Sequence, residues 1–275
     1  MRIDLHTHST RSDGTDSPTQ LVRKAAEVAA LDVVALTDHD ATTGWQEAQE
    51  AADAVGITLV RGIEISTTFR GESVHLLGYE FDPGYAPLVQ ELSRVLGGRD
   101  DRLPRMLARL AEHGVHITEA DVAAQSGDAA ASGRPHVADA MVAKGYIRHR
   151  DEAFDGWLNT GGRAHVDRYA APLVEAVQLL KAAGGRAVVA HPWSRGSDRV
   201  LTPETFERLR GAGLDGVEVD HVDHGDTARR ELRAIATDLD LVVTGSSDYH
   251  GTGKSEAFRL GANLTDPEQY ARLLG

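Results

Sequence analysis

The first residues of this chain that could do chemistry are two histidines separated by one threonine, in Asp4-Leu5-His6-Thr7-His8. They follow a short apolar run that is typical of a strand. In an extended segment, residues two apart point to the same side, so His6 and His8 could place two imidazoles on one metal ion. A pair of this kind also occurs at ordinary surface or core positions. The pair therefore needs support from the rest of the chain.

Histidines and carboxylates recur where later apolar runs end. Strands are predicted at residues 2–5, 32–36, 58–65, 74–81, 186–190, 216–219 and 241–244. Asp13 follows the first strand, and later strands reach Thr37-Asp38-His39-Asp40, Glu64, His191-Pro192-Trp193 and Ser247-Asp248-Tyr249-His250. In α/β barrels, the carboxyl ends of the strands form the face where active sites assemble. These side chains are therefore predicted to meet at one site.

His75 lies near the start of its strand rather than at the end. Only residues 66–73 separate the third and fourth strands, which is too short for a helical crossover, so we predict a hairpin with Gly71 in its loop. The start of one hairpin strand lies beside the end of the other, which would put His75 next to Glu64. Imidazoles and carboxylates suit manganese, iron or zinc, and the share of carboxylates favours manganese or iron. The set is too large for one ion.

The elements that must position these residues alternate in type. Helices are predicted at residues 17–30, 43–55, 172–183, 203–210, 226–238 and 267–274. Strands that alternate with helices indicate a parallel α/β sheet, closed or doubly wound. From residue 82 to residue 171 the strand pattern disappears, and helices are predicted at 88–96, 102–113, 119–125 and 136–144. Gly97-Gly98 and residues 126–133 are expected to be turns or mobile joints.

We therefore expect residues 1–81 and 172–275 to form the domain with the metal site, and residues 82–171 to form a helical insertion that acts as a substrate lid. The 275 residues include 29 Lys and Arg, 42 Asp and Glu, and no cysteine, a formal net charge of −13. The acidic balance argues against duplex DNA as a partner, and the lack of cysteine excludes a thiolate nucleophile. Neither a signal peptide nor a membrane span is predicted, so we expect a cytoplasmic enzyme without a membrane partner.

As an ordered set, these motifs resemble the PHP (polymerase and histidinol phosphatase) family of metal-dependent phosphoesterases. The matching motifs are His6-Thr7-His8, Ser12-Asp13-Gly14-Thr15, Thr37-Asp38-His39-Asp40, Gly62-Ile63-Glu64, His75, Ala190-His191-Pro192 and Ser247-Asp248-Tyr249-His250. The resemblance implies a distorted (β/α)7 barrel that binds three divalent ions, with manganese favoured over iron or zinc. It assigns His6, His8, Glu64 and Asp248 to one ion, Glu64, His75 and His191 to a second, and Asp13, His39 and His250 to a third. Asp13 stands where many members have a histidine, which is similar to the subgroup that acts on nucleoside 3′,5′-bisphosphates.

The reaction that this resemblance implies is phosphate ester hydrolysis. Water held between two ions is acidified far below its free pKa of about 15.7, so hydroxide is available at neutral pH. Glu64, Asp248 and His191 would be the catalytic residues because they hold the ions, and Asp38 is expected to orient an imidazole. The favoured reaction removes the 3′-phosphate of a nucleoside 3′,5′-bisphosphate. The alternatives are 5′-3′ trimming of short RNA, histidinol-phosphate hydrolysis, and a PHP accessory module without enzymatic activity.

Four further residues are candidates for substrate binding. Arg134 and His136 lie in Gly133-Arg134-Pro135-His136, which is similar to a motif of the bisphosphatase subgroup, and a guanidinium can hold a phosphate with two hydrogen bonds. The alternative is a helix that starts at the proline, with Arg134 in solvent. Arg163 follows a glycine pair and is a weaker phosphate candidate. His221 ends the sixth strand and could contact substrate or protonate the leaving group, or else lie in a solvated loop.

Overall fold

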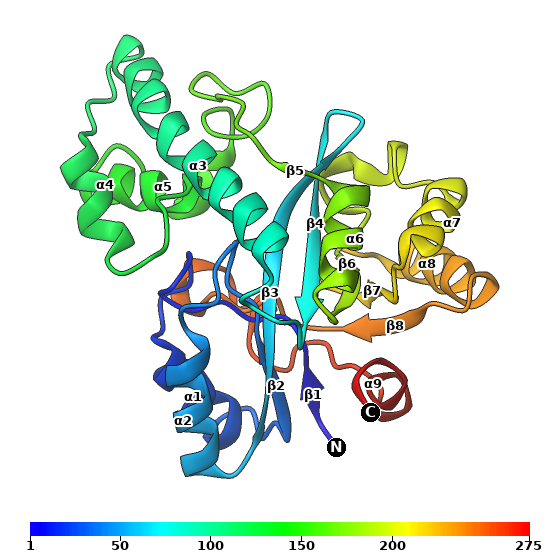
Figure 1. Ribbon diagram of the computed structural model, residues 1–275. Coiled ribbons are helices and arrows are strands. Elements are labelled where there is room, and N and C mark those ends of the chain that lie inside the picture. The colour runs from blue at the N-terminus through cyan, green and yellow to red at the C-terminus, as the bar shows by residue number, and fades with distance from the viewer.

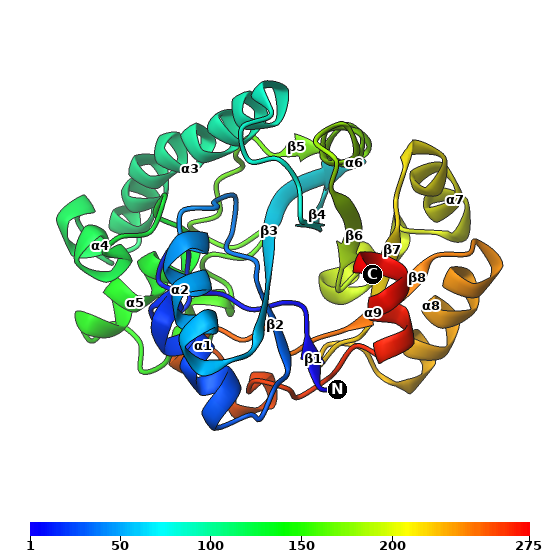
Figure 2. The same ribbon diagram turned by 60° about the horizontal axis from the view of Figure 1, so that its bottom comes forward.

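The structure is a computed structural model that describes residues 1–275, the side chain of Arg195 excepted. One curved sheet forms its centre, and helices cover the outside of that sheet (Figures 1 and 2). Seven strands follow one another around the sheet: β1 (Ile3–Asp4), β2 (Val33–Leu36), β3 (Thr58–Phe69), β4 (Glu72–Tyr79), β6 (Arg186–Ala190), β7 (Gly216–Asp220) and β8 (Val242–Gly245). A parallel bridge between Thr7 and Tyr249 links the chain just after β1 to the chain just after β8. The sheet is therefore nearly closed, and the predicted distorted seven-stranded barrel is confirmed.

Strands β3 and β4 form the predicted hairpin. They pair antiparallel, and the turn residues Arg70 and Gly71 both have positive φ, of 50° and 84°. Two positive φ values in a two-residue loop match the twist of the flanking strands. The register sets His75 opposite Ser66, so His75 lies diagonally across from Glu64. A short eighth strand, β5 (Ala171–Pro172), pairs with β3 outside the main succession.

Alternate residues of the strands face two different cores, as the two-residue period of a strand requires. Ile3 and Val33 point into the barrel, where α9 (Pro267–Leu274) closes one end with Leu273. Val34 and Leu36 point outward to the surrounding helices. Those helices are α1 (Pro18–Glu27), α2 (Trp45–Val55), α6 (Leu173–Ala182), α7 (Pro203–Ala212) and α8 (Asp226–Asp238). Burial on both faces explains why the strands read as continuous apolar runs.

The segment between β4 and β5 is helical and projects to one side of the barrel (Figure 1). It contains α3 (Ala86–Glu112), α4 (Glu119–Ser126), α5 (Arg134–Ala143) and the 3-10 turn η1 (Arg150–Phe154). Its own cluster of buried apolar side chains includes Met106, Leu110 and Val137. Among the helices that the structure describes, none is long and apolar enough to cross a membrane.

The prediction of a joint at Gly97-Gly98 was wrong. Helix α3 runs through both glycines and also through Pro104, so the two helices expected at 88–96 and 102–113 are one. Packing against a distant part of the chain keeps this segment helical, although glycine has a low helix propensity. A Cβ on Gly98 would lie 3.1 to 3.2 Å from atoms of Tyr169, so the bare glycine lets the returning chain lie directly against α3. The other predicted loop, residues 126–133, does separate α4 from α5.

Candidate metal centre

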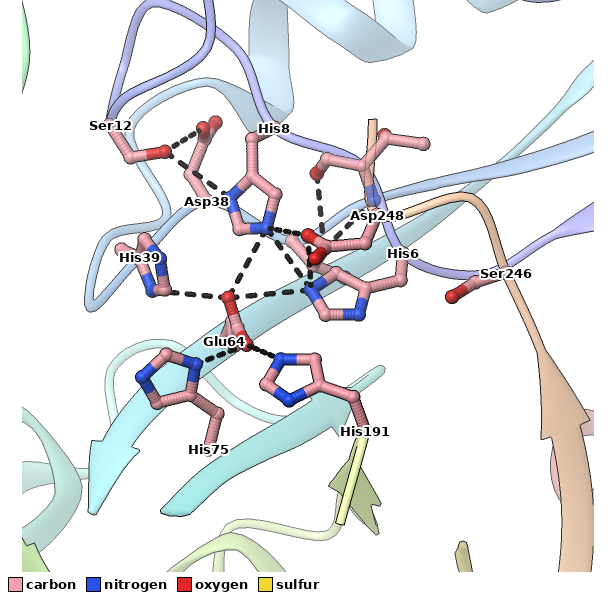
Figure 3. Close-up of polar contacts among 12 residues, drawn as sticks. His6, His8, Ser12, Asp38, His39, Glu64, His75, His191, Ser246 and Asp248 are labelled. Atoms are coloured by element: carbon pink, nitrogen blue, oxygen red, sulfur yellow. Dashed lines mark hydrogen bonds and ion pairs between the residues drawn. The ribbon is translucent and has the colours of Figure 1, made fainter. Parts of the chain in front are cut away.

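Glu64 lies at the centre of the site (Figure 3). Strand β3 delivers it, and its side chain is only 1% exposed. Its oxygen Oε2 lies 3.3 Å from His6 Nε2, 3.2 Å from His8 Nε2 and 3.1 Å from His39 Nδ1, and Oε1 lies 2.7 Å from His75 Nδ1 and 3.2 Å from His191 Nε2. Each oxygen thus faces its own group of imidazoles. This is the geometry that a carboxylate bridging two cations requires.

Every residue predicted as a ligand lies in one continuous cluster. The ligand atoms fall into four groups, each within 4.8 Å: His8, Asp13, His39 and His250; His6, His8 and Asp248; His6, Glu64 and His191; and His39, Glu64 and His75. The division among three ions stays a prediction. His191 and Asp248 have positive φ, of 25° and 51°. Residues other than glycine rarely adopt such φ values, and backbone strain of this kind concentrates at functional sites.

The outer nitrogens of several imidazoles are held by protein groups. His6 Nδ1 lies 3.2 Å from Glu218 Oε1, and His191 Nδ1 lies 3.0 Å from Ser194 Oγ. His250 Nδ1 donates to the Asp248 carbonyl at 2.8 Å. Each contact turns Nε2 toward the cluster, as is typical of histidines that bind metals. The buried oxygen Oδ1 of Asp13 has no hydrogen bond to any group that the structure describes. These observations fit a site for cations.

The electrostatics of the cluster distinguish two kinds of histidine. Burial lowers the pKa of His191 to about 4 and that of His250 to about 4, so both are neutral imidazoles at pH 7. Burial also acts to lower the pKa of His8, but Asp248 and Glu64 outweigh it and raise this pKa to about 9. Burial opposes ionisation of Glu64, yet the surrounding histidines hold its pKa well below the usual range. Without cations, His8 thus has a proton that a metal ion must displace.

Glu218 is a buried carboxylate that the sequence analysis missed. It lies on β7, and its Oε2 accepts a hydrogen bond of 2.8 Å from the backbone N–H of His191. Its Oε1 accepts from Ser246 Oγ and contacts His6. Burial acts to raise its pKa, but His6, His221 and His191 together outweigh burial and lower the pKa to about 2. Glu218 therefore orients two predicted ligands. A single Glu within the apolar run 216–219 was the available signal.

Asp38 does not bind an imidazole as expected. It accepts hydrogen bonds from Ser9 N at 2.8 Å, Ser9 Oγ at 2.7 Å and Ser12 Oγ at 2.6 Å. Ser12 Oγ in turn lies 3.4 Å from His8 Nδ1. The aspartate thus fixes the loop after β1 and reaches His8 only through Ser12. Two serines spaced three residues apart offered more hydrogen-bond donors than one ring nitrogen.

Two of the four predicted substrate-binding residues lie at the cluster. His136 lines a small cavity together with Asp13 and His39, and its Nδ1 accepts from Gly133 N at 3.0 Å. His221 Nε2 lies 3.4 Å from Asp248 Oδ2. The His221 side chain is 0% exposed and contacts this predicted ligand, and its part in protonating a leaving group stays a prediction.

The other two lie farther out. Arg134 begins α5, is partly buried and donates to the Leu158 carbonyl at 3.2 Å. The guanidinium of Arg163 is exposed and stacks over Trp157, 4.2 Å from the ring centre. The structure therefore does not bring Arg163 to the metal cluster.

The structure also gathers arginines that the sequence analysis did not single out. Arg99 lines the same cavity as His136, and its Nε and Nη2 donate to Asp40 Oδ2 at 3.1 and 2.6 Å. Arg102, one turn later on α3, is 5% exposed, and within the described chain its Nε has no hydrogen bond. Burial lowers the Arg102 pKa to about 8, with repulsion from Arg168, Arg134 and Arg99 adding to it. Because a joint was predicted at residues 97–98, Arg99 and Arg102 were not recognised as neighbours on one face of a continuous helix.

Comparison with known proteins agrees with this geometry. The PHP domain family matches residues 4–155. A 5′-3′ exoribonuclease of Haemophilus influenzae is 32% identical over 90% of this chain and 90% of its own. A 3′,5′-nucleoside bisphosphate phosphatase of Chromobacterium violaceum is 32% identical over 92% of this chain and 88% of its own. A solved structure from Bifidobacterium adolescentis, described as a metal-dependent phosphoesterase, has a TM-score of 0.92 and 36% identity over 99% of this chain and 95% of that one. This chain therefore belongs to the PHP family of metal-dependent phosphoesterases.

Proposed function

We propose that the protein is a phosphoric monoester hydrolase that removes the 3′-phosphate of nucleoside 3′,5′-bisphosphates, using three divalent ions, manganese by preference. The observation that supports this choice is the position of the arginines. Arg99 and His136 line one cavity with Asp13 and His39, and Arg99, Arg134 and Arg168 are the guanidinium groups that repel that of Arg102. A bisphosphate needs an anion site next to the metal site.

The charge in this region favours a second phosphate. Asp40 is the carboxylate that pairs with Arg99 in the described structure, and it also accepts hydrogen bonds from Ser66. One carboxylate beside the guanidinium groups of Arg99, Arg102 and Arg168 leaves an excess of positive charge in a chain whose formal net charge is −13. A phosphate dianion would offset most of that excess. Guanidinium groups bind phosphate through paired, charge-assisted hydrogen bonds.

Within this proposal the roles of the residues are distinct. The bound ions supply an activated water and offset the charge that develops on the scissile phosphate. Glu64, His191 and Asp248 hold the ions in place, and Glu218 fixes the orientation of His6 and His191. Arg134 and His136 bind the other phosphate. The insertion at residues 82–171 therefore acts as the lid that selects the substrate.

Short RNA is the second candidate substrate. The Haemophilus influenzae relative is named for 5′-3′ exoribonuclease activity, and it matches this chain as well as the phosphatase does. A nucleoside 3′,5′-bisphosphate contains the same groups as the 5′-phosphorylated end of an RNA chain. One site could thus accept both substrates.

A substrate panel tests the proposal. Enzyme stripped of metal and reloaded with manganese is given adenosine 3′,5′-bisphosphate, 5′-phosphorylated short RNA or histidinol phosphate, and released phosphate and nucleotides are measured. We expect the highest kcat/KM for the bisphosphate. Faster release of mononucleotides from RNA would favour the second candidate. Preference for histidinol phosphate would overturn the proposal.

A further inference from the structure

We propose that Arg150 is a positioning residue that ties the helical insertion to the loops holding the third ion, so that this ion binds tightly only when the insertion is in place. The proposal rests on the proposed three-ion site, because Asp13 and His250 are two of that ion's predicted ligands. Arg150 is not one of the predicted metal ligands, and it is not one of the arginines that surround Arg102.

The insertion itself fixes the guanidinium of Arg150. Arg150 begins η1, and its Nε and Nη2 donate to the two oxygens of Asp139 on α5 at 2.7 and 2.5 Å. The side chains of Arg150 and Asp139 are 13% and 24% exposed. A bidentate pair of this kind holds the plane of the guanidinium in one orientation. The remaining nitrogen, Nη1, is therefore aimed by the insertion.

Nη1 contacts the barrel loops on both sides of the third ligand group. It donates to the Asp13 carbonyl at 3.3 Å and to the Gly253 carbonyl at 3.4 Å. The two loops also meet directly, since Thr15 N donates to the His250 carbonyl at 3.2 Å. Their ligand atoms, His250 Nε2 and Asp13 Oδ1, lie 3.3 Å apart. One guanidinium thus joins the insertion to both loops at once.

Gly253 shows how closely this contact is fitted. A Cβ at this position would lie 2.3 Å from Arg150 Nη1. Gly253 is buried, so a side chain could not turn away without moving Arg150 or the loop. The lack of a side chain here is what allows the guanidinium to reach the Gly253 carbonyl.

The arrangement predicts a specific effect on one ion. Removing the guanidinium frees the Asp13 and Gly253 carbonyls, and the carboxylate of Asp13 is then less well held opposite His250. Loss of groups that orient metal ligands commonly weakens metal binding ten- to a hundredfold. A lysine keeps the charge but cannot bind Asp139 with two parallel bonds and reach both carbonyls. Glu64, His75 and His191 lie on other parts of the chain than the two loops that Arg150 contacts, whereas Asp248 lies two residues before His250 in one of them.

Manganese binding to Arg150→Lys and Arg150→Ala tests this, measured by calorimetric titration of stripped protein. We expect the third ion to bind about tenfold or more weakly, and the ion assigned to Glu64, His75 and His191 to bind as in the wild type. Asp139→Asn should also weaken binding of the third ion. In a double variant with Arg150→Ala it should weaken that binding little further. Arg148→Ala, an exposed arginine two residues earlier, is the matched control.

If Arg150→Lys binds three ions with wild-type affinity, the proposed role of Arg150 is overturned. Equal weakening of the binding of all three ions in this variant would overturn it too. If Arg150→Ala does not fold, the lysine variant decides. Asp13→Ala separates the two proposals. If wild-type protein binds no more ions than Asp13→Ala does, the three-ion site fails, and the role of Arg150 fails with it.

Discussion

Glu64 is the residue on which most of the site depends, because each of its two oxygens faces a different set of imidazoles. We predict that Glu64→Gln keeps the fold but lowers kcat on p-nitrophenyl phosphate by about 100-fold or more at saturating manganese, since an amide cannot bridge two cations. Circular dichroism and metal content are measured alongside. Glu204→Gln, on the exposed start of α7, is the control. Turnover close to wild type would remove Glu64 from the bridge.

Arg134 is the residue that should separate a bisphosphatase from a general phosphatase. Arg134→Ala removes a charge-assisted contact worth roughly 1.5 to 3 kcal/mol, which is about ten- to a hundredfold in kcat/KM. The loss should fall on adenosine 3′,5′-bisphosphate and largely spare p-nitrophenyl phosphate. Arg105→Ala, exposed on α3, should change neither substrate. Equal losses on both substrates would indicate that Arg134 is structural.

At the scale of elements, the chain shows where local signals suffice and where they do not. The short connection with Gly71 predicted the β3–β4 hairpin, because turn geometry is a local property. The pair Gly97-Gly98 is an equally strong local signal, yet it lies inside a helix of 27 residues. Contact with Tyr169, far along the chain, explains the difference. Contacts of that range are not visible in the sequence.

These two glycines give a matched pair of variants. No atom lies within 4 Å of a Cβ built on Gly97, whereas one built on Gly98 lies 3.1 Å from Tyr169 Cβ. Gly97→Ala should raise the free energy of unfolding by about 0.5 to 1 kcal/mol, because alanine favours the helix. Gly98→Ala should raise the free energy of unfolding by less than Gly97→Ala does, or should lower it. Denaturant unfolding checks both, and equal stabilisation by the two variants would contradict this packing of α3.

At the scale of the whole molecule, the barrel and the clustering of the predicted ligand residues could be predicted together. Residues such as His39 and Asp248 follow apolar runs, and parallel strands bring such ends to one face. Glu218 was missed because it lies within a strand, where the sequence does not say which face points into the barrel. Arg99 was missed because it comes from the insertion, whose docking against Asp40 depends on the assembled fold. The contacts that support the predicted ligands, rather than the clustering of those ligands, required the structure.

The whole cluster also predicts how metal binding depends on pH. Burial acts to lower the pKa of His6, but Glu64, Glu218 and Asp248 outweigh burial and raise this pKa well above 6.5. The pKa of His8 is about 9. The Nε2 atoms of the two rings lie 3.0 Å apart, so the pair shares at least one proton at pH 7 in metal-free protein, which manganese must displace, whereas His191 is already neutral. Apparent manganese affinity should therefore rise from pH 7 toward pH 9. Calorimetry in buffers of different ionisation enthalpy measures the protons released, and release of none at pH 7 would contradict this account.

The most direct test of the central claim uses adenosine 3′,5′-bisphosphate and enzyme stripped of metal. Released phosphate and the remaining nucleotide are measured before and after manganese is added back. The account predicts no hydrolysis by the stripped enzyme, and phosphate with adenosine 5′-phosphate as products once manganese is restored. Hydrolysis that does not depend on metal, or adenosine 3′-phosphate as the product, would contradict it.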